Sequence, residues 1–375
     1  MKFVVSSTTL LSHLQIVGRV IGSKNTLPIL NNLLFKLEGN ELEITASDLE
    51  TTLSTKIMLE NVSGSGAITI PNKILIDTLK EFSEQPLSFD IDEGTMRISI
   101  ISENGQFNIV GQSADEFPSI AQMAQEEAVT IDLSSELLLS GISKTLFATS
   151  DDEMRPTLAG IYFDLREANV LTFAATDSHK MVRYRRTDVA PHAEGSFILA
   201  KKPAQLLKLL LAKESDVRLM FDSKVAQFSM ANYTLVCRLV EGAYPNYNAA
   251  IPQDNPNSMV IDRMDIYAST RRVSNFSNAA TNLVQLTIGS NQCEISAQDT
   301  DFAVSGRETL PCEYTGESIE IGFKSNFLLE ILSNLSSQHV TLTMSSPSRA
   351  GLFLPHEQEN PNEEVIMLLM PISLT

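Results

Sequence analysis

Basic side chains are scarce relative to acidic ones in this chain of 375 residues. Lysine and arginine number 28 against 46 aspartates and glutamates, which gives a formal net charge of −18. Affinity for nucleic acid comes mainly from Lys and Arg that neutralise phosphates, so the sum argues at first against a nucleic-acid partner. The positions of the positive charges are therefore more informative than their total.

Cysteine is equally rare. Cys237, Cys293 and Cys312 are widely spaced, odd in number and unlike any metal-binding pattern. This usage favours buried or idle thiols in a reducing cytoplasm. We therefore expect no metal and no cofactor.

Long apolar runs are absent. The longest, residues 206–212 and 365–370, fall far below the roughly 20 residues that cross a bilayer. Ser6-Ser7-Thr8-Thr9 interrupts the apolar start too early for a signal peptide. The sequence predicts a cytoplasmic protein with no membrane partner.

Motifs of catalysis are missing as well. There is no Gly-x-Ser-x-Gly elbow, phosphate-binding Gly-rich loop or His-Glu-x-x-His helix. Asp177-Ser178-His179 contains the residue types of a hydrolytic triad, but neighbours on a strand point to opposite faces, and a triad is defined by its geometry. Asp151-Asp152-Glu153 could bind a divalent ion, although a solvated hairpin tip is the favoured interpretation. We therefore expect that the protein is not an enzyme. The alternative, a hydrolase built on Ser178 and His179, would be supported only by measured turnover of ester substrates.

Internal repetition is what the sequence does contain. Residues 42–48 alternate apolar and polar side chains and end in a small residue, a polar residue and Asp, and residues 171–177 and 293–299 do the same. The repeat of roughly 125 residues is long enough to be a domain rather than a solenoid unit.

Each copy has the same predicted order of elements. A strand and an amphipathic helix precede the Asp-ending strand, and another strand and a second helix follow it. The first helices are expected near residues 10–21, 137–146 and 266–276, and the second at 71–82, 202–211 and 324–335. Pro71 suits the first turn of its helix.

The predicted fold class is therefore α+β, with three similar domains that each pack two helices on antiparallel sheets. We expect domain bounds of 1–125, 126–255 and 256–375. The polar or Pro-containing segments 122–127 and 252–256 are typical of linkers.

The predicted helices carry a large share of the basic residues. These are Arg19, Lys24, Lys73, Lys80, Lys144, Lys201, Lys202, Lys208, Arg263, Arg271, Arg272 and Lys324. If all six helices line one surface, that surface is far more positive than the net charge suggests. Solubility is the alternative reason for such residues. No helix has a base-reading face, so DNA contacts would be to phosphates and without sequence preference.

Six short motifs then point to a family. They are Thr26-Leu27-Pro28-Ile29-Leu30, Ser47-Asp48-Leu49-Glu50, Asp115-Glu116-Phe117-Pro118, Ala175-Thr176-Asp177-Ser178-His179-Lys180, Leu239-Val240-Glu241-Gly242-Ala243-Tyr244-Pro245 and Met370-Pro371-Ile372. In order and spacing they resemble the β subunit of bacterial DNA polymerase III over the whole chain. The resemblance implies a sliding clamp: a head-to-tail homodimer that forms a ring around double-stranded DNA and acts as processivity factor of the replicative polymerase. A protein scaffold that never meets DNA is the competing class.

The resemblance also implies site residues. Matching positions for DNA contact in the lumen or at the pore rim are Lys24, Lys73, Arg155, Lys201 and Lys202. An apolar cleft between the second and third domains would bind short peptides of the DNA polymerase III catalytic subunit, other polymerases, the clamp loader and mismatch-repair proteins. Its matching positions are Leu158, Thr176, Ser178, His179, Lys180, Met181, Pro245, Ala250, Phe327, Leu368, Met370, Pro371 and Ile372. For the dimer seam they are Phe107 and Val273.

The chain departs from the family pattern in several places. Ser178 stands where Gly is usual, Lys180 where Arg is usual and Ala249 where Arg is frequent, while Thr375 extends the tail past the usual terminal Leu. These changes bear on which peptides the site prefers. Without the resemblance, Met370-Pro371-Ile372 would be interpreted as part of a final core strand.

Overall fold

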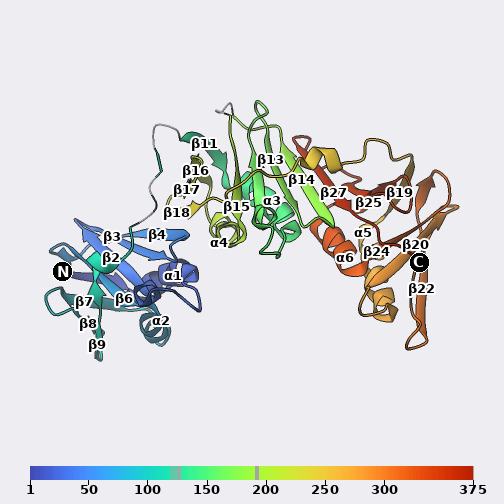
Figure 1. Cartoon of the computed structure of the whole chain (residues 1–375). Helices are drawn as coiled ribbons and strands as arrows, with labels where there is room; N and C mark the ends of the chain where they lie inside the picture. Colours follow the sequence, from blue (N-terminus) through green and yellow to red (C-terminus); the bar gives the residue numbers. More distant parts are fainter. Residues whose placement is uncertain (120, 122, 125–127, 191–193, 375) are drawn as a thin grey trace. The chain divides into compact units, whose positions relative to one another are not determined.

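The computed structural model describes residues 1–119, 121, 123–124, 128–190 and 194–374 (Figure 1). It contains two compact units, one made of Met1–Ser135 and Gln205–Leu239, the other of Glu136–Ala204 and Val240–Thr375. The second repeat is therefore divided between the units. The expected domain boundary at 125/126 lies outside the described residues.

Six α-helices lie where the sequence predicts them within the described residues. The first helix of each repeat directly follows a strand: β1 (Lys2–Ser6) leads into α1 (Ser7–Val17), β11 (Val129–Ser134) into α3 (Ser135–Thr145), and β19 (Asn257–Asp262) into α5 (Arg263–Val273). The second helices do the same: β6 (Gly66–Pro71) precedes α2 (Asn72–Lys80), β15 (Ser196–Ala200) precedes α4 (Lys201–Leu211), and β24 (Ile319–Lys324) precedes α6 (Ser325–Asn334).

The first unit contains two antiparallel sheets. The larger has the order β10 (Gln112–Ser113), β6, β2 (Asn32–Glu38), β3 (Glu41–Ser47), β4 (Thr51–Met58), β18 (Tyr233–Arg238), β17 (Val225–Ser229), β16 (Asp216–Phe221), β11. The smaller has the order β5 (Val62–Ser63), β1, β7 (Pro86–Asp92), β8 (Arg97–Ile101), β9 (Gln106–Val110). The β4–β18 pair joins the first repeat to the second, and α1 and α2 lie side by side.

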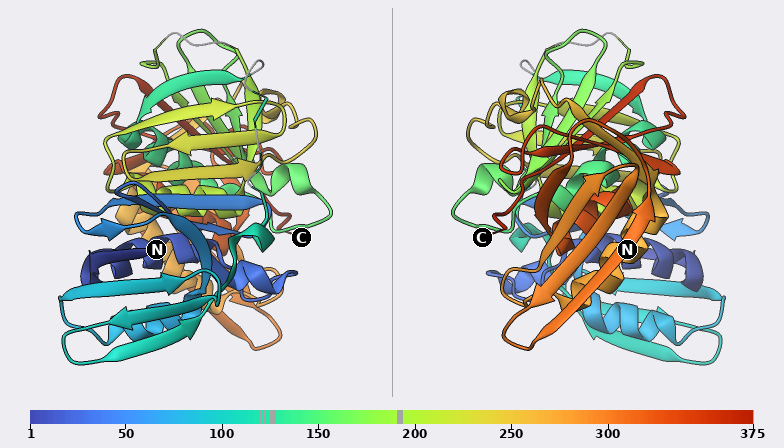
Figure 2. Two further views of the ribbon diagram at one scale, coloured as in Figure 1. Left: turned by 90° about the vertical axis from the view of Figure 1, so that its left-hand side faces the viewer. Right: turned by 90° about the vertical axis from the view of Figure 1, so that its right-hand side faces the viewer.

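The second unit repeats this plan. Its larger sheet has the order β15, β12 (Gly160–Asp164), β13 (Leu171–Thr176), β14 (Lys180–Arg186), β27 (Glu363–Leu369), β26 (Gly351–Pro355), β25 (His339–Met344), β19, β23 (Glu313–Thr315). The four-stranded sheet, seen in Figure 2, has the order β22 (Val304–Pro311), β21 (Gln292–Asp299), β20 (Leu283–Gly289), β24. Here the β14–β27 pair joins the second repeat to the third.

The repeated Asp forms the turn after its strand. In each repeat its Oδ1 atom accepts the backbone N–H groups two and three residues further on, at 3.0 and 2.7 Å for Asp48, 2.8 and 2.8 Å for Asp177, and 2.9 and 3.3 Å for Asp299. A short side chain that bonds the following backbone is what makes Asp favourable in turns. The motif found in the sequence is therefore a structural turn signal.

Three local expectations were wrong. Pro71 ends β6 and stands at the N-cap of α2 rather than in its first turn, and Lys324 ends β24 rather than lying in α6. Asp151-Asp152-Glu153 lies in a loop between two 3₁₀ helices (Leu146–Ala148 and Pro156–Leu158), not at a hairpin tip. In the first two cases the helix begins one residue later than expected.

No helix in the described part of the chain is long and apolar enough to cross a membrane. The same residues contain no group of three His, Cys, Asp or Glu side chains that could hold a metal ion.

Candidate functional site

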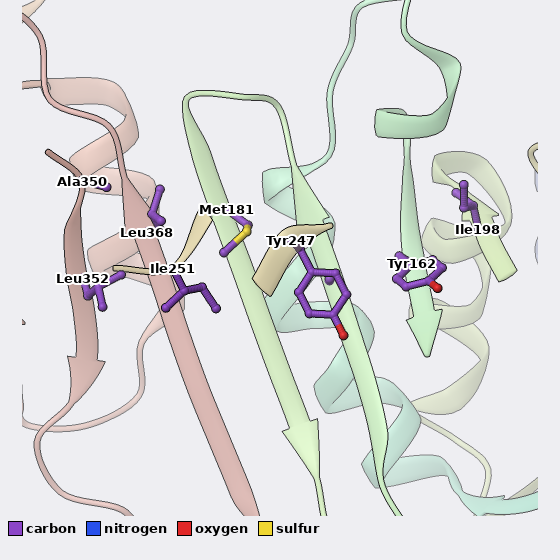
Figure 3. Packing of buried hydrophobic residues seen from close by; sticks show 9 residues of the cluster. Tyr162, Met181, Ile198, Tyr247, Ile251, Ala350, Leu352 and Leu368 are labelled. Carbon is purple, nitrogen blue, oxygen red and sulfur yellow. The ribbon is translucent and has the colours of Figure 1, made fainter. Parts of the chain in front are cut away.

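An apolar cluster lies on one face of the larger sheet of the second unit. In register, Met181 is opposite both Thr176 and Leu368, and Leu368 is opposite Leu352, so these side chains share one face. The complete cluster is Tyr162, Ala174, Met181, Ile198, Tyr247, Ile251, Ala350, Leu352 and Leu368. Figure 3 shows its labelled members distributed over β12, β14, β15, β27, β26 with the residue before it, and the segment that carries Tyr247 and Ile251.

Residues 244–251 are fixed over this face by aromatic and polar contacts. Tyr244 stacks on Tyr162 with ring centroids 4.7 Å apart, and the Tyr247 hydroxyl donates to Asp164 Oδ2 at 3.0 Å. Burial alone would raise the pKa of Asp164, but hydrogen bonds from Arg166 and Tyr247 lower it, so the carboxylate stays charged. Burial raises the pKa of Tyr247 to about 12, so its hydroxyl remains a donor at neutral pH.

The turn at residues 176–180 forms one border of the cluster. Ser178 has φ 77°, a left-handed conformation that costs least for glycine, which explains why glycine is usual here in the family. Thr176 Oγ1 accepts the Ser178 N–H at 3.1 Å, and Ser178 Oγ accepts from Arg155 Nη1 at 2.8 Å. The His179 carbonyl accepts the Met370 N–H at 2.8 Å, so the C-terminal segment is attached to this turn.

Lys180 is directed inward. It is 5% exposed, and its Nζ atom lies 2.7 Å from Asp177 Oδ2 and 3.0 Å from Glu330 Oε2. Burial would raise the pKa of Asp177, but Lys180 and two backbone N–H groups lower it. The Lys180 charge is therefore neutralised inside the protein. Both carboxylate oxygens of Asp177 already accept hydrogen bonds, Oδ1 from two backbone N–H groups and Oδ2 from Lys180, so the carboxylate is not placed to orient a histidine in a catalytic triad.

Phe327 brings the third repeat to the same place. Its ring, carried by α6, lies 4.3 Å from Lys180 Nζ and 5.5 Å from Lys324 Nζ, and its centroid is 5.8 Å from that of His179. The Ile372 N–H donates to Gly322 O at 2.9 Å, which holds the tail beside β24. The structure thus brings His179, Lys180, Phe327 and the 370–372 segment together.

The expected peptide-site residues differ in exposure. Those exposed are Ser178, His179, Pro245, Ala250 and Met370; those partly exposed are Thr176, Phe327, Pro371 and Ile372; those buried are Leu158, Lys180, Met181 and Leu368. The expected site residues thus combine buried apolar side chains with exposed ones.

The expected DNA residues fall into two groups. Lys24 and Lys73 are exposed, and no carboxylate within the described residues forms an ion pair with either. Lys201 pairs with Asp151, and Arg155 Nε donates to Asp152 Oδ2 at 2.8 Å, so their charges are partly neutralised. Lys202 lies beside Lys201 in the first turn of α4.

The two expected seam residues also differ. Phe107 on β9 is 39% exposed and makes an edge contact with Phe82 at 5.4 Å. Val273 is 2% exposed and packs in the core of its own unit, so it offers no surface to a second copy. It lies seven residues after Ile266 on the buried face of α5.

Several residues of the site were missed from the sequence. The two aromatic side chains of the cluster, Tyr162 and Tyr247, gave no signal by which they could be placed in the site, and Tyr247 lies in an irregular segment. Glu330 is distant in sequence from the Lys180 that it neutralises. Asp177, in contrast, was found from the sequence, since the Asp repeats in all three copies.

Comparison with known proteins agrees with this architecture. Models of the N-terminal, central and C-terminal domains of the DNA polymerase III beta subunit match residues 1–121, 132–246 and 248–373. The beta sliding clamps of Vibrio cholerae and Synechococcus elongatus are 29% and 28% identical, with all of each chain covered. A sliding clamp structure from Bartonella birtlesii, 28% identical, superposes over all of both chains with a TM-score of 0.91.

The repeated strand–helix units and their antiparallel sheets define a three-domain clamp fold of the sliding-clamp class. The chain belongs to the DNA polymerase III beta subunit family, which is a family of non-catalytic processivity factors.

Proposed function

We propose that two copies of this chain form a ring around duplex DNA, without sequence specificity, and tether polymerases, the clamp loader and mismatch-repair proteins. The observation that supports this most is the match of all three family domains in sequence, together with full-length relatives named as clamps. Because a bacterial replication protein acts on DNA in the cytoplasm, we infer that this protein is cytoplasmic. We place the domain bounds near residues 125 and 255; the matched domains span residues 1–121, 132–246 and 248–373.

DNA contact would come from helix ends. A Cβ atom on Gly18 would lie 3.0 Å from Asn72 Oδ1, so the end of α1 meets the start of α2, with Arg19 and Lys73 next to these residues. The first turns of α2 and α4 contain no acidic residue and carry Lys73 or Lys201 and Lys202. The positive end of a helix dipole and nearby lysines both favour phosphate oxygens.

The chain's own strand pairing indicates how two copies would join. The second strand of the Asp turn pairs with the last strand of the next repeat at both internal junctions, β4 with β18 and β14 with β27. In both, the residue beyond the last pair donates its N–H to the carbonyl two residues after the Asp, Arg238 to Glu50 and Met370 to His179, each at 2.8 Å. The corresponding β22 and β9 are edge strands in the described chain.

Continuing this pairing rule places β22 of one copy beside β9 of another. Phe107 and Val110 on β9 are 39 and 67% exposed. Phe302, two residues before β22, and Val304, its first residue, are 79 and 41% exposed. Exposed edge strands with such side chains are ready to pair with another chain. Because the two surfaces differ, the contact is head-to-tail, and two of them close a ring.

The peptide site would be the apolar cluster bordered by the 176–180 turn, Phe327 and the 370–372 segment. Met181 and Leu368 would form its floor, since they belong to the buried cluster and stand opposite each other in the sheet. His179, Pro245 and Met370 are exposed at its border and could contact a bound chain.

Retention on circular DNA tests the proposed function. After loading onto a nicked circle by a clamp loader with ATP, we expect the protein to remain bound, and to be lost when the circle is cut. Replacing Lys24 and Lys73 with Gln should shorten retention, more so at higher salt, because phosphate contacts are lost. Lys80, which pairs with Asp77 on the same helix, provides the matched control variant Lys80→Gln. Equal retention on circular and linear DNA would contradict enclosure.

A further inference from the structure

Two lysines approach the same aromatic ring from different surroundings. Lys180 Nζ and Lys324 Nζ lie 4.3 and 5.5 Å from the Phe327 centroid, both within the distance at which a cation is attracted to a ring. Lys180 is 5% exposed, while Lys324 is partly exposed at the end of β24. The two ammonium groups are therefore not equivalent for a ligand that arrives from solvent.

Their charge balance differs too. Lys180 is neutralised by Asp177 and Glu330. Lys324 forms no ion pair with a carboxylate of the described residues, and its ammonium group lies over the Phe327 ring.

Three other basic side chains around the site are paired with carboxylates. Arg155 pairs with Asp152, and Arg183 and Arg185 pair with Glu364. Unlike Arg155, Arg183 and Arg185, Lys324 carries a positive charge that the described chain leaves without a carboxylate. It adjoins the tail, because Gly322, two residues earlier, binds Ile372.

We propose that Lys324 is a specificity-determining residue that pairs with an acidic side chain of the bound peptide. The inference rests on the proposed peptide site, and it adds the chemistry of the preferred ligand: an apolar segment with Asp or Glu at the position that reaches the Phe327 end. An ammonium without a partner that is partly desolvated by an aromatic ring gains most from a carboxylate.

The remainder of the molecule makes this preference diagnostic. A chain with a net charge of −18 repels acidic ligands at long range. At most peptide positions, therefore, Asp should bind no better than the isosteric Asn. A preference for Asp at one position requires a local positive charge.

The test measures affinities of short fluorescein-labelled peptides by fluorescence anisotropy, using the full-length dimer. The parent peptide is the clamp-binding segment of the same organism's DNA polymerase III catalytic subunit, with each non-apolar position made Asp or Asn in turn. We expect one position at which Asp binds about three- to ten-fold more tightly than Asn. Lys324→Met should bring this ratio to about one, and Lys324→Glu should invert it.

Two control variants separate local from general effects. Lys180→Met should weaken all peptides but keep the Asp/Asn ratio, because its charge is already neutralised. Lys144→Met, on α3, should change neither affinity nor ratio. If the wild-type protein binds the peptides but its ratio persists in Lys324→Met, or no position prefers Asp, the role of Lys324 is refuted. If no peptide binds at all, the proposed peptide site itself fails.

Discussion

At the scale of single residues, His13 is held where the first two repeats meet. Its Nδ1 atom lies 2.6 Å from Thr55 Oγ1, whose hydroxyl donates to Asn232 O at 3.0 Å. Because the Thr55 hydrogen is already used, Nδ1 must donate, which fixes the tautomer of the neutral ring. The ring also stacks on Tyr233 with centroids 5.7 Å apart. Burial lowers the pKa of His13 below its ordinary value of 6.5.

This arrangement predicts a pH-dependent loss of stability in the first unit. Above pH 6.5 the ring is neutral in both folded and unfolded chains, and its stabilising contacts are complete. As pH falls below 6.5 the unfolded chain binds the proton first, so stability decreases by at most about 1.4 kcal/mol per pH unit. His13→Gln should remove this part of the decrease in melting temperature between pH 7 and pH 5. Identical pH profiles for the two proteins would contradict it.

Residue roles were only partly predictable from the sequence. Met181 and Leu368, which the resemblance assigned to the peptide site, both lie in the apolar cluster, and their part in binding a peptide stays a prediction. The inward orientation of Lys180 was not predicted, because its partner Glu330 lies on α6, in another repeat and 150 residues away in sequence. For Val273 the helical pattern already indicated the buried face, and matching by family position alone overlooked this.

At the scale of elements, the C-terminal segment is positioned by two backbone hydrogen bonds. Met370 binds the 176–180 turn and Ile372 binds Gly322, so the segment connects the second repeat to β24. Removing residues 370–375 should lower peptide affinity by at least about ten-fold, since an exposed border and two ordered contacts are lost. Anisotropy titration measures the affinity, and sedimentation should still give a dimer.

A shorter truncation serves as control. Removing only residues 373–375 keeps both hydrogen bonds and should leave the affinity within about two-fold of wild type, which is below the net value of one hydrogen bond. Unchanged affinity after the longer deletion would remove the tail from the proposed site.

The helices and strands themselves were largely predictable, because the same order of apolar patterns occurs in all three repeats. The helices follow apolar residues at helical spacing, and the Asp turns follow a signal that occurs three times. Positions at element ends were less predictable: Pro71 and Lys324 lie where a strand passes directly into a helix, and neither residue type marks that change by itself. Pairing between repeats, which builds the site, has no local signal.

At the scale of the whole molecule, the edge strands β9 and β22 determine the expected assembly. Charged residues placed there should prevent pairing, because a carboxylate cannot be buried unpaired between two apolar edges. Phe107→Glu or Val304→Glu should therefore give monomers at micromolar concentration, as measured by sedimentation velocity. Met58, which is 70% exposed on β4, provides the control Met58→Glu, which should remain dimeric.

A substitution of Val273 distinguishes a role in the dimer interface from a role in the core. As it is 2% exposed, Val273→Ala should lower the melting temperature of the second unit, consistent with a cost of about 1 to 3 kcal/mol for shortening a buried aliphatic side chain, while leaving the dimer intact. A dimer that persists with both Phe107→Glu and Val304→Glu would exclude the β9–β22 seam. If the Val273→Ala protein is monomeric and its melting temperature is unchanged, Val273 belongs to the interface, because only a contact between copies could then explain the effect.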